Sequence, residues 1–302
     1  MPSQPQDPAW KSFGKAPLGG GQAGGRPVPA DKTHLKRFPF VFLVDVSHST
    51  SLGGDNADLH AINRELAKCF ETLRNPPSDS DLADVKGQID ICLVTYSEAV
   101  RDIFLWQPAD ELPTSLDLKS ETRTFTHAAL NHAMDLIEQR LKVLKQPGQK
   151  VQTGAPHIFH ITDGVPNDVY PNMPQWKQLV DRLAQFATNA DQDRATDQKG
   201  HLLHFITPSA ERIQKDNPFI DETGKQISGK EALIKMSGEK TVITLNRGAA
   251  SLPDVVKLIT AVIIVKSTNS KVSVAETIAE AVEDSDGALG IPDTNLPAVA
   301  KQ

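Results

Sequence analysis

The sequence predicts an α/β fold: a doubly wound, mostly parallel sheet of six strands, with helices on both faces and one antiparallel hairpin at an edge. Short apolar segments alternate along the chain with longer segments whose apolar residues recur at helical spacing. The short segments are almost continuously apolar, which is typical of parallel strands buried on both faces. A single pair of them is too close in sequence to hold a helix between them, which indicates a hairpin.

The expected strands follow this pattern in chain order. The first, VFLVD, is apolar up to its terminal Asp45. The next two, QIDICLVTYS and VRDIFLW, form the hairpin. HIFHITD, HLLHFIT and TVITL complete the sheet. The six segments cover residues 41–45, 88–97, 100–106, 157–163, 201–207 and 241–245.

The expected helices lie between these strands. In residues 58–74, Leu59, Ile62 and Leu66 fall on one helical face, and residues 127–145 repeat the pattern. Pro174 suits the first position of a third helix. Ser251 and Asp254 resemble a capping box at the start of a last helix that runs to about residue 265.

The chain divides into three parts by composition. Residues 1–36 are rich in Gly and Pro and carry a basic excess, so we expect a flexible arm. Residues 37–267 form the folded domain, and residues 268–302 form an acidic tail that we also expect to be flexible. Residues 208–230 are longer than a minimal connection and contain a small hairpin around Thr223 and Gly224. This insertion is either an inert loop or a source of partner specificity.

Composition excludes several classes of protein. The net charge of -6 argues against a nucleic-acid-binding surface. Cys69 and Cys92 lie in apolar patterns and are expected to be buried thiols without a disulfide. We find no signal-peptide pattern and no apolar run of about 18 residues, so we expect a cytoplasmic protein with no membrane partner.

Small oxygen ligands gather at three element boundaries. Asp45 ends an apolar strand, and Ser47 and Ser49 follow at alternate positions. Thr124 precedes a helical pattern, and Asp163 ends another strand just before Gly164. Ligands of doubly wound sheets bind beyond the carboxyl ends of the strands, so Asp45 and Asp163 are expected at one edge. A hard cation such as Mg²⁺ takes oxygen ligands in a compact shell, whereas an apolar core has no need of them.

This arrangement resembles a von Willebrand factor A (VWA) domain with a complete metal-ion-dependent adhesion site. That family has D-x-S-x-S, then a Thr before a helix containing Ala-Leu, then a T-D-G segment. The resemblance covers about residues 38–267. It implies a metal site that holds Mg²⁺, with Mn²⁺ or Ca²⁺ as alternatives, on Asp45, Ser47, Ser49, Thr124 and Asp163.

His48 departs from the family pattern, and Thr126 is an alternative to Thr124. His48 stands where the family usually has Gly; it is not a ligand position, and we expect it at the rim that faces a partner. Thr126 is a second candidate threonine, but the spacing to Ala129 and Leu130 favours Thr124.

In its details the chain resembles the intracellular bacterial TerY-like branch of the family. The cues are FVFLVDVS, the tight hairpin, ITDGVPND and the segment TVITL followed by SLPDVVKLI. The resemblance implies a place in tellurite-resistance, stress-response or phage-defence gene sets. It also implies a partner that is a protein kinase or a metal-dependent protein phosphatase.

The resemblance implies a non-enzymatic, Mg²⁺-dependent protein-interaction module. Neutral hydroxyl ligands leave the ion under-neutralised, so an Asp or Glu of a partner completes its coordination. Two alternatives stay open: a metal-dependent phosphoesterase, and a scaffold whose metal is only structural. No convergent His, Lys or third carboxylate offers itself as a general base, which disfavours the enzyme.

Other polar residues have simpler interpretations. Asp168 either accepts from a metal-bound water or forms a cap or turn, and we favour the cap or turn. His157 and His160 lie three residues apart on one strand, as do His201 and His204 on another. Alternation sends the members of each pair to opposite faces, so neither pair can chelate zinc. We interpret them as core or surface histidines.

Overall fold

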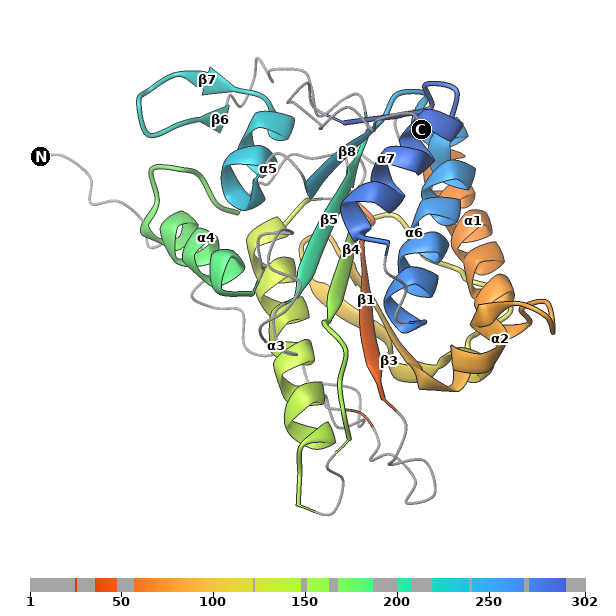
Figure 1. The fold of residues 1–302 in the computed structure, drawn as a ribbon. Helices are drawn as coiled ribbons and strands as arrows, with labels where there is room; N and C mark the ends of the chain where they lie inside the picture. Colours follow the sequence, from red (N-terminus) through yellow and green to blue (C-terminus); the bar gives the residue numbers. More distant parts are fainter. Residues whose placement is uncertain are drawn as a thin grey trace, which may run out of the picture.

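The computed structural model describes residues 25, 36–47, 57–121, 123–147, 151–162, 168–186, 200–207, 219–238, 241–268 and 272–291. A central sheet lies between two layers of helices, as Figure 1 shows. The α/β fold class predicted from the sequence is therefore confirmed.

Within the described part of the chain, the main sheet contains seven strands in the order β3-β2-β1-β4-β5-β8-β9. The neighbours from β2 to β8 pair in parallel, whereas β3 and β9 pair antiparallel at the two edges. The strands are β1 (Phe38–Asp45), β2 (Ile89–Tyr96), β3 (Val100–Pro108), β4 (His157–Thr162), β5 (His201–Ile206), β8 (Val242–Leu245) and β9 (Leu289–Gly290). The order reverses between β1 and β4, and this reversal is the topological switch point.

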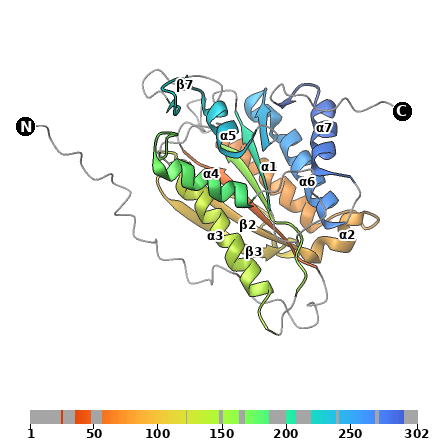
Figure 2. The same ribbon diagram turned by 60° about the vertical axis from the view of Figure 1, so that its left-hand side comes forward.

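Two groups of helices cover the two faces of the sheet, as Figures 1 and 2 show from two directions. The first group is α1 (Ala57–Arg74), α2 (Asp81–Val85), α6 (Leu252–Ser267) and α7 (Val274–Asp284). The second group is α3 (Thr126–Leu144), α4 (Pro174–Phe186) and α5 (Gly229–Ser237).

Strand β1 shows how the two layers are built. Its side chains alternate between faces: Phe40 and Phe42 lie in the core beneath α1 and α6, whereas Val41 and Leu43 lie in the core beneath α3. All four are fully buried. Phe42 meets Phe70 of α1 edge to face, with ring centroids 5.3 Å apart. Burial on both faces explains why this strand is almost continuously apolar.

A buried ionic cluster lies near the amino end of β1 and β2. The carboxylate of Asp90 on β2 is fully buried between two arginines. Nη2 and Nε of Arg140, on α3, lie 2.7 Å and 3.1 Å from its Oδ2, and Nη2 of Arg37 lies 3.2 Å from its Oδ1. The cluster ties α3 and the start of β1 to β2, at the end of the sheet opposite Asp45.

The C-terminal region differs from our expectation. Residues 272–291, which we assigned to an acidic flexible tail, form α7 and β9. Helix α7 packs on α6, and β9 pairs with β8 as a seventh strand. Ser273 and Glu276 form a reciprocal capping box at the start of α7. The folded unit therefore extends to residue 291, past the boundary at 267. Of the expected basic arm, only residues 25 and 36 lie within the described residues.

The start of α6 is also built differently. Ser251 does precede the helix, but its hydroxyl donates to the carbonyl of Ala288 (2.8 Å) and accepts from the N–H of Arg247 (3.1 Å). It therefore joins α6 to the segment that enters β9 and makes no capping box with Asp254.

Helix α6 also corrects our statement on apolar runs. Residues 248–267 form one continuous helical stretch that is long and apolar enough to cross a membrane, judged by length and composition alone. In this fold α6 lies against α1 and α7, and its residues Val255, Ile259 and Val262 are fully buried. Packing on several sides accounts for its apolar composition.

The predicted hairpin in the 208–230 insertion is present. Strand β6 (Phe219–Ile220) pairs antiparallel with β7 (Gln226–Ile227). Oδ1 of Asp221 accepts from the N–H groups of Thr223 (2.9 Å) and Lys225 (3.0 Å), which fixes the turn. Residues 208–218 lie outside the described residues.

Both cysteines are buried free thiols, as expected. Burial raises the pKa of Cys69 to about 12, so this thiol stays protonated at neutral pH.

Candidate metal centre

Asp45 lies at the carboxyl end of β1, next to the switch point, and is fully buried. Among the described residues, three uncharged groups donate to its carboxylate: the N–H of Ser47 to Oδ1 (2.9 Å), and the hydroxyls of Thr162 (2.9 Å) and Tyr96 (3.4 Å) to Oδ2. Register explains this convergence, because Asp45 is opposite Tyr96 on β2 and Val44 is opposite Ile161 on β4. The carboxylate is thus held in place without neutralisation by these donors.

Ser47 lies beside the segment that leads into α3. The N–H of Glu121 donates to the carbonyl of Val46 (2.8 Å), and Ser47 forms a parallel β-bridge with Glu121. Further along, the N–H of Phe125 donates to the carbonyl of Ser97 (3.0 Å). These two hydrogen bonds hold the segment that carries Thr124 against the residues that follow β1 and β2.

Thr124 lies between those two anchoring points and is 1% exposed. The structure therefore brings the segments that carry Asp45, Ser47 and Thr124 together at one edge, as the sequence predicts. Thr126 is the first residue of α3 and its hydroxyl is buried without a hydrogen-bond partner in the described part of the chain.

Two of the five predicted ligand positions, Ser49 and Asp163, lie outside the described residues, as does His48 of the expected rim. The expected ligand roles of Ser49 and Asp163 thus stay predictions.

Glu121 belongs to the surroundings of the site, and sequence reasoning missed it. The buried hydroxyl of Ser97 donates to its Oε2, and Arg101 of β3 forms an ion pair with its Oε1. Arg101 and Arg123 are both more than half exposed and pair with Glu121 and Glu98 respectively. The rim on the β2–β3 side of the site therefore carries charges of both signs.

Asp168 forms a cap, as we favoured. Its two carboxylate oxygens accept from the N–H groups of His127 (3.0 Å) and Ala128 (2.9 Å) in the first turn of α3. Burial raises the pKa of Asp168 to about 6, while the backbone N–H groups of α3 act in the opposite direction. This carboxylate fixes the helix that follows Thr124.

Two histidines lie beneath the site and were not connected with it by the sequence analysis. His160 on β4 is opposite His204 on β5, and their Nδ1 atoms are 2.6 Å apart. Nε2 of His160 lies 2.6 Å from the hydroxyl of Tyr96. His157 and His201 are likewise opposite each other and stack at 4.7 Å. The predicted opposite-face placement within each strand holds, but the histidines meet across strands.

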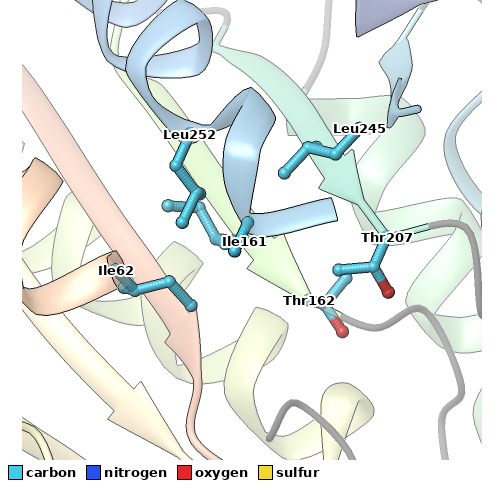
Figure 3. Close-up of a pocket in the computed structure, with 7 residues that line it drawn as sticks. Ile62, Ile161, Thr162, Thr207, Leu245 and Leu252 are labelled. Atoms are coloured by element: carbon cyan, nitrogen blue, oxygen red, sulfur yellow. The ribbon is translucent and has the colours of Figure 1, made fainter. Parts of the chain in front are cut away.

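A small pocket, shown in Figure 3, lies between the sheet and the helices α1 and α6. Its walls come from α1, β4, β8 and the start of α6, and they are mostly aliphatic. The lining residues are Ile62, Ile161, Thr162, Thr207, Leu245, Ala249 and Leu252. The hydroxyl of Thr162 donates to Asp45, so this residue connects the wall of the pocket with the candidate site.

The described residues fit a small, hard divalent cation. Asp45, Ser47 and Thr124 offer carboxylate and hydroxyl oxygens, which Mg²⁺, Mn²⁺ and Ca²⁺ prefer, and neither His nor Cys is among them. Asp45 is fully buried, and the groups that donate to its carboxylate within the described residues are uncharged, so these donors do not themselves balance its charge. The residues that would hold the ion are thus Asp45, Ser47 and Thr124, with Ser49 and Asp163 as predicted additions.

Comparison with solved structures finds chains of similar fold at low identity. The ArnB paralog VWA2 from Sulfolobus acidocaldarius aligns with 74% of this chain and 45% of its own length, with 13% identity and a TM-score of 0.42. Proximal thread matrix protein 1 from the mussel byssus, with a zinc-occupied MIDAS motif, aligns with 76% of this chain and 49% of its own, with 13% identity and a TM-score of 0.44. The D319A mutant of the PilB minor pilin from Streptococcus sanguinis aligns with 76% and 62%, with 13% identity and a TM-score of 0.43.

The chain therefore spans about half the length of the first two of these proteins. No family model matches the chain, and no curated protein matches it. Since similarity at this level carries no argument about function, the function must be argued from the site.

Proposed function

We propose that this chain is a non-enzymatic interaction module that binds one divalent cation, Mg²⁺ above all, and uses it to capture an Asp or Glu of a partner protein. The observation that carries the proposal is the buried carboxylate of Asp45 at the switch point, with Ser47 and the Thr124 segment beside it. Neutral hydroxyl ligands leave positive charge on an ion in this place, and a partner carboxylate would balance it.

The surrounding carboxylates support binding over catalysis. Glu121 is engaged by Ser97 and Arg101, and Asp168 is engaged by backbone N–H groups of α3. These contacts occupy both carboxylates, which disfavours either of them as the general base that a phosphoesterase would require. A scaffold with a purely structural metal remains the alternative that an experiment must separate.

The finer parts of the proposal rest on the sequence resemblance. In a TerY-like setting the partner would be a protein kinase or a metal-dependent protein phosphatase of a bacterial stress-response, tellurite-resistance or phage-defence gene set. Such a partner would present an exposed acidic residue to the ion.

Capture of a purified candidate kinase or phosphatase tests the proposal. We expect the immobilised chain to retain the partner in Mg²⁺, to release it in EDTA and to retain it again when Mg²⁺ is restored. Asp45→Asn preserves the shape of the side chain but removes its charge, so it should abolish capture. Asp135→Asn, in an exposed ion pair on α3, should leave capture unchanged.

Two outcomes would refute the proposal. Capture that is equal in Mg²⁺ and EDTA would show that the metal is structural or irrelevant. Hydrolysis of p-nitrophenyl phosphate in Mg²⁺ that is lost in Asp45→Asn would identify a phosphoesterase instead.

A further inference from the structure

A continuous chain of buried polar side chains crosses the sheet beneath Asp45. It runs from His204 on β5 to His160 on β4 and on to Tyr96 on β2, which lies next to the carboxylate. All three members are fully buried. They lie on the face covered by α3, α4 and α5, among the apolar side chains of that core. Buried polar groups in such a core are normally hydrogen-bonded, so each contact along this series of side chains needs one donor and one acceptor.

The two histidines of this hydrogen-bond chain, His160 and His204, are neutral. Burial lowers the pKa of His204 to about 3 and that of His160 well below its usual range, and the neighbouring His204 lowers the latter further. Each neutral imidazole carries one N–H, so one ring nitrogen donates and the other accepts. Two arrangements of the hydrogens are then possible along the chain.

In the first arrangement every hydrogen points toward Asp45. Nδ1–H of His204 donates to Nδ1 of His160, Nε2–H of His160 donates to the oxygen of Tyr96, and the Tyr96 hydroxyl donates to Oδ2 of Asp45. Nε2 of His204 then carries no hydrogen. This agrees with its environment, because Nε2 is buried without a hydrogen-bond partner among the described residues.

The second arrangement reverses every hydrogen and is disfavoured at both ends. It places an N–H on Nε2 of His204, where a buried donor would lack an acceptor among the described residues, and burying an unsatisfied donor is unfavourable. It also turns the hydroxyl hydrogen of Tyr96 toward His160, so that a phenol oxygen faces a carboxylate oxygen. An ionised carboxylate can only accept, so this contact would be repulsive.

We infer that His204, His160 and Tyr96 form a one-directional hydrogen-bond chain that positions the carboxylate of Asp45 for the cation. The inference rests on the proposed function in so far as it concerns the cation. Tyr96 and Thr162 together hold Oδ2 while Ser47 holds Oδ1, so both oxygens are oriented before an ion arrives. Tyr96 and the two histidines are positioning residues, because they act on the ion only through Asp45.

The tautomers of His160 and His204 test the direction in which the hydrogen bonds run. Long-range ¹H–¹⁵N correlation spectra of the full chain at pH 7.5, without metal, should show His160 protonated on Nε2 and His204 protonated on Nδ1. His160 protonated on Nδ1 with His204 protonated on Nε2 would overturn the inference. This readout does not depend on metal binding, so it stays decisive if the proposed function fails.

The positioning role is tested by calorimetric titration with Mn²⁺. Removing an outer hydrogen bond of a metal ligand typically weakens metal binding about 10–100-fold, and we expect Tyr96→Phe to fall in this range. His204→Leu should also weaken Mn²⁺ binding, although two side chains separate it from Asp45. The matched control is His157→Leu, since His157 is as buried as His204, lies on the neighbouring strand β4 and is not a member of the hydrogen-bond chain.

The three variants separate the possible explanations. Unchanged Mn²⁺ affinity in Tyr96→Phe, with thermal unfolding showing an intact fold, would overturn the positioning role. Equal losses in His204→Leu and His157→Leu would indicate a general effect of core disruption and would also overturn it. Absence of Mn²⁺ binding by the unaltered chain would refute the proposed function while leaving the tautomer result to stand alone.

Discussion

The free energy of unfolding is expected to fall steeply as the pH drops below 6.5. His157, His160 and His204 are fully buried, and burial lowers the pKa of all three. For His204 the folded-state pKa is about 3, against 6.5 when unfolded. Between these values the unfolded chain takes up a proton that the folded chain does not, so stability is fully present above 6.5 and is lost as the pH falls.

The size of the effect follows from the number of groups. Each such histidine contributes about 1.4 kcal/mol per pH unit, so three contribute about 4 kcal/mol per pH unit well below 6.5. Asp168 acts in the opposite sense between its unfolded pKa of 3.8 and its folded pKa of about 6, but it is a single group. The net loss of about 3 kcal/mol per pH unit is large beside a typical domain stability of about 5–15 kcal/mol.

Urea unfolding at pH 7.5, 6.5, 5.5 and 5.0 measures this slope. His157→Leu removes one of the three groups and should lower the net slope by about 1.4 kcal/mol per pH unit, which is about half of it, whatever the variant does to the stability at pH 7.5. A free energy of unfolding that stays constant from pH 7.5 to 5.0 would contradict the neutral, buried state of these histidines.

Asp90→Ala is expected to destabilise the fold by about 3–5 kcal/mol, because it leaves two buried guanidinium groups without their shared carboxylate. Arg140 is 2% exposed and Arg37 is 5% exposed, so water cannot replace Asp90. Asp135→Ala is the control, since Asp135 is half exposed in its ion pair with Arg182 and should cost about 0–1 kcal/mol. Urea unfolding at pH 7.5 compares the two. A loss below about 1 kcal/mol for Asp90→Ala would show that the cluster is hydrated or rearranges.

Periodicity was sufficient to predict most of the fold. Continuous apolar runs located β1, β4 and β5, and the spacing of Leu59, Ile62 and Leu66 located α1. Helix α7 was missed because the acidic residues of that region suggested a solvated tail. A local signal did exist, since Ser273 and Glu276 form a capping box ahead of the buried Val274 and Ile278. Strand β9 is two residues long and depends on pairing with β8, which no local pattern reveals.

The candidate site, like the fold, was predictable from the sequence only in part. The positions of Asp45, Ser47 and Thr124 were predictable because each lies at the boundary of a regular element, whereas their roles as ligands stay predictions. The chain from Tyr96 to His204 was not, because it depends on the register between strands that are distant in sequence. His160 meets His204 only after β4 and β5 pair, and Glu121 meets Ser97 only after the segment before α3 docks on β2. Tertiary pairing, and not local propensity, decides these contacts.

The most direct test of the account is a titration of the chain with Mn²⁺ followed by electron paramagnetic resonance, which reports the free ion. The account predicts one Mn²⁺ per chain, displaced by Mg²⁺, with binding lost in Asp45→Asn and retained in Asp135→Asn. Binding by Asp45→Asn with the affinity of the unaltered chain would contradict the claim that this edge of the sheet is a metal centre.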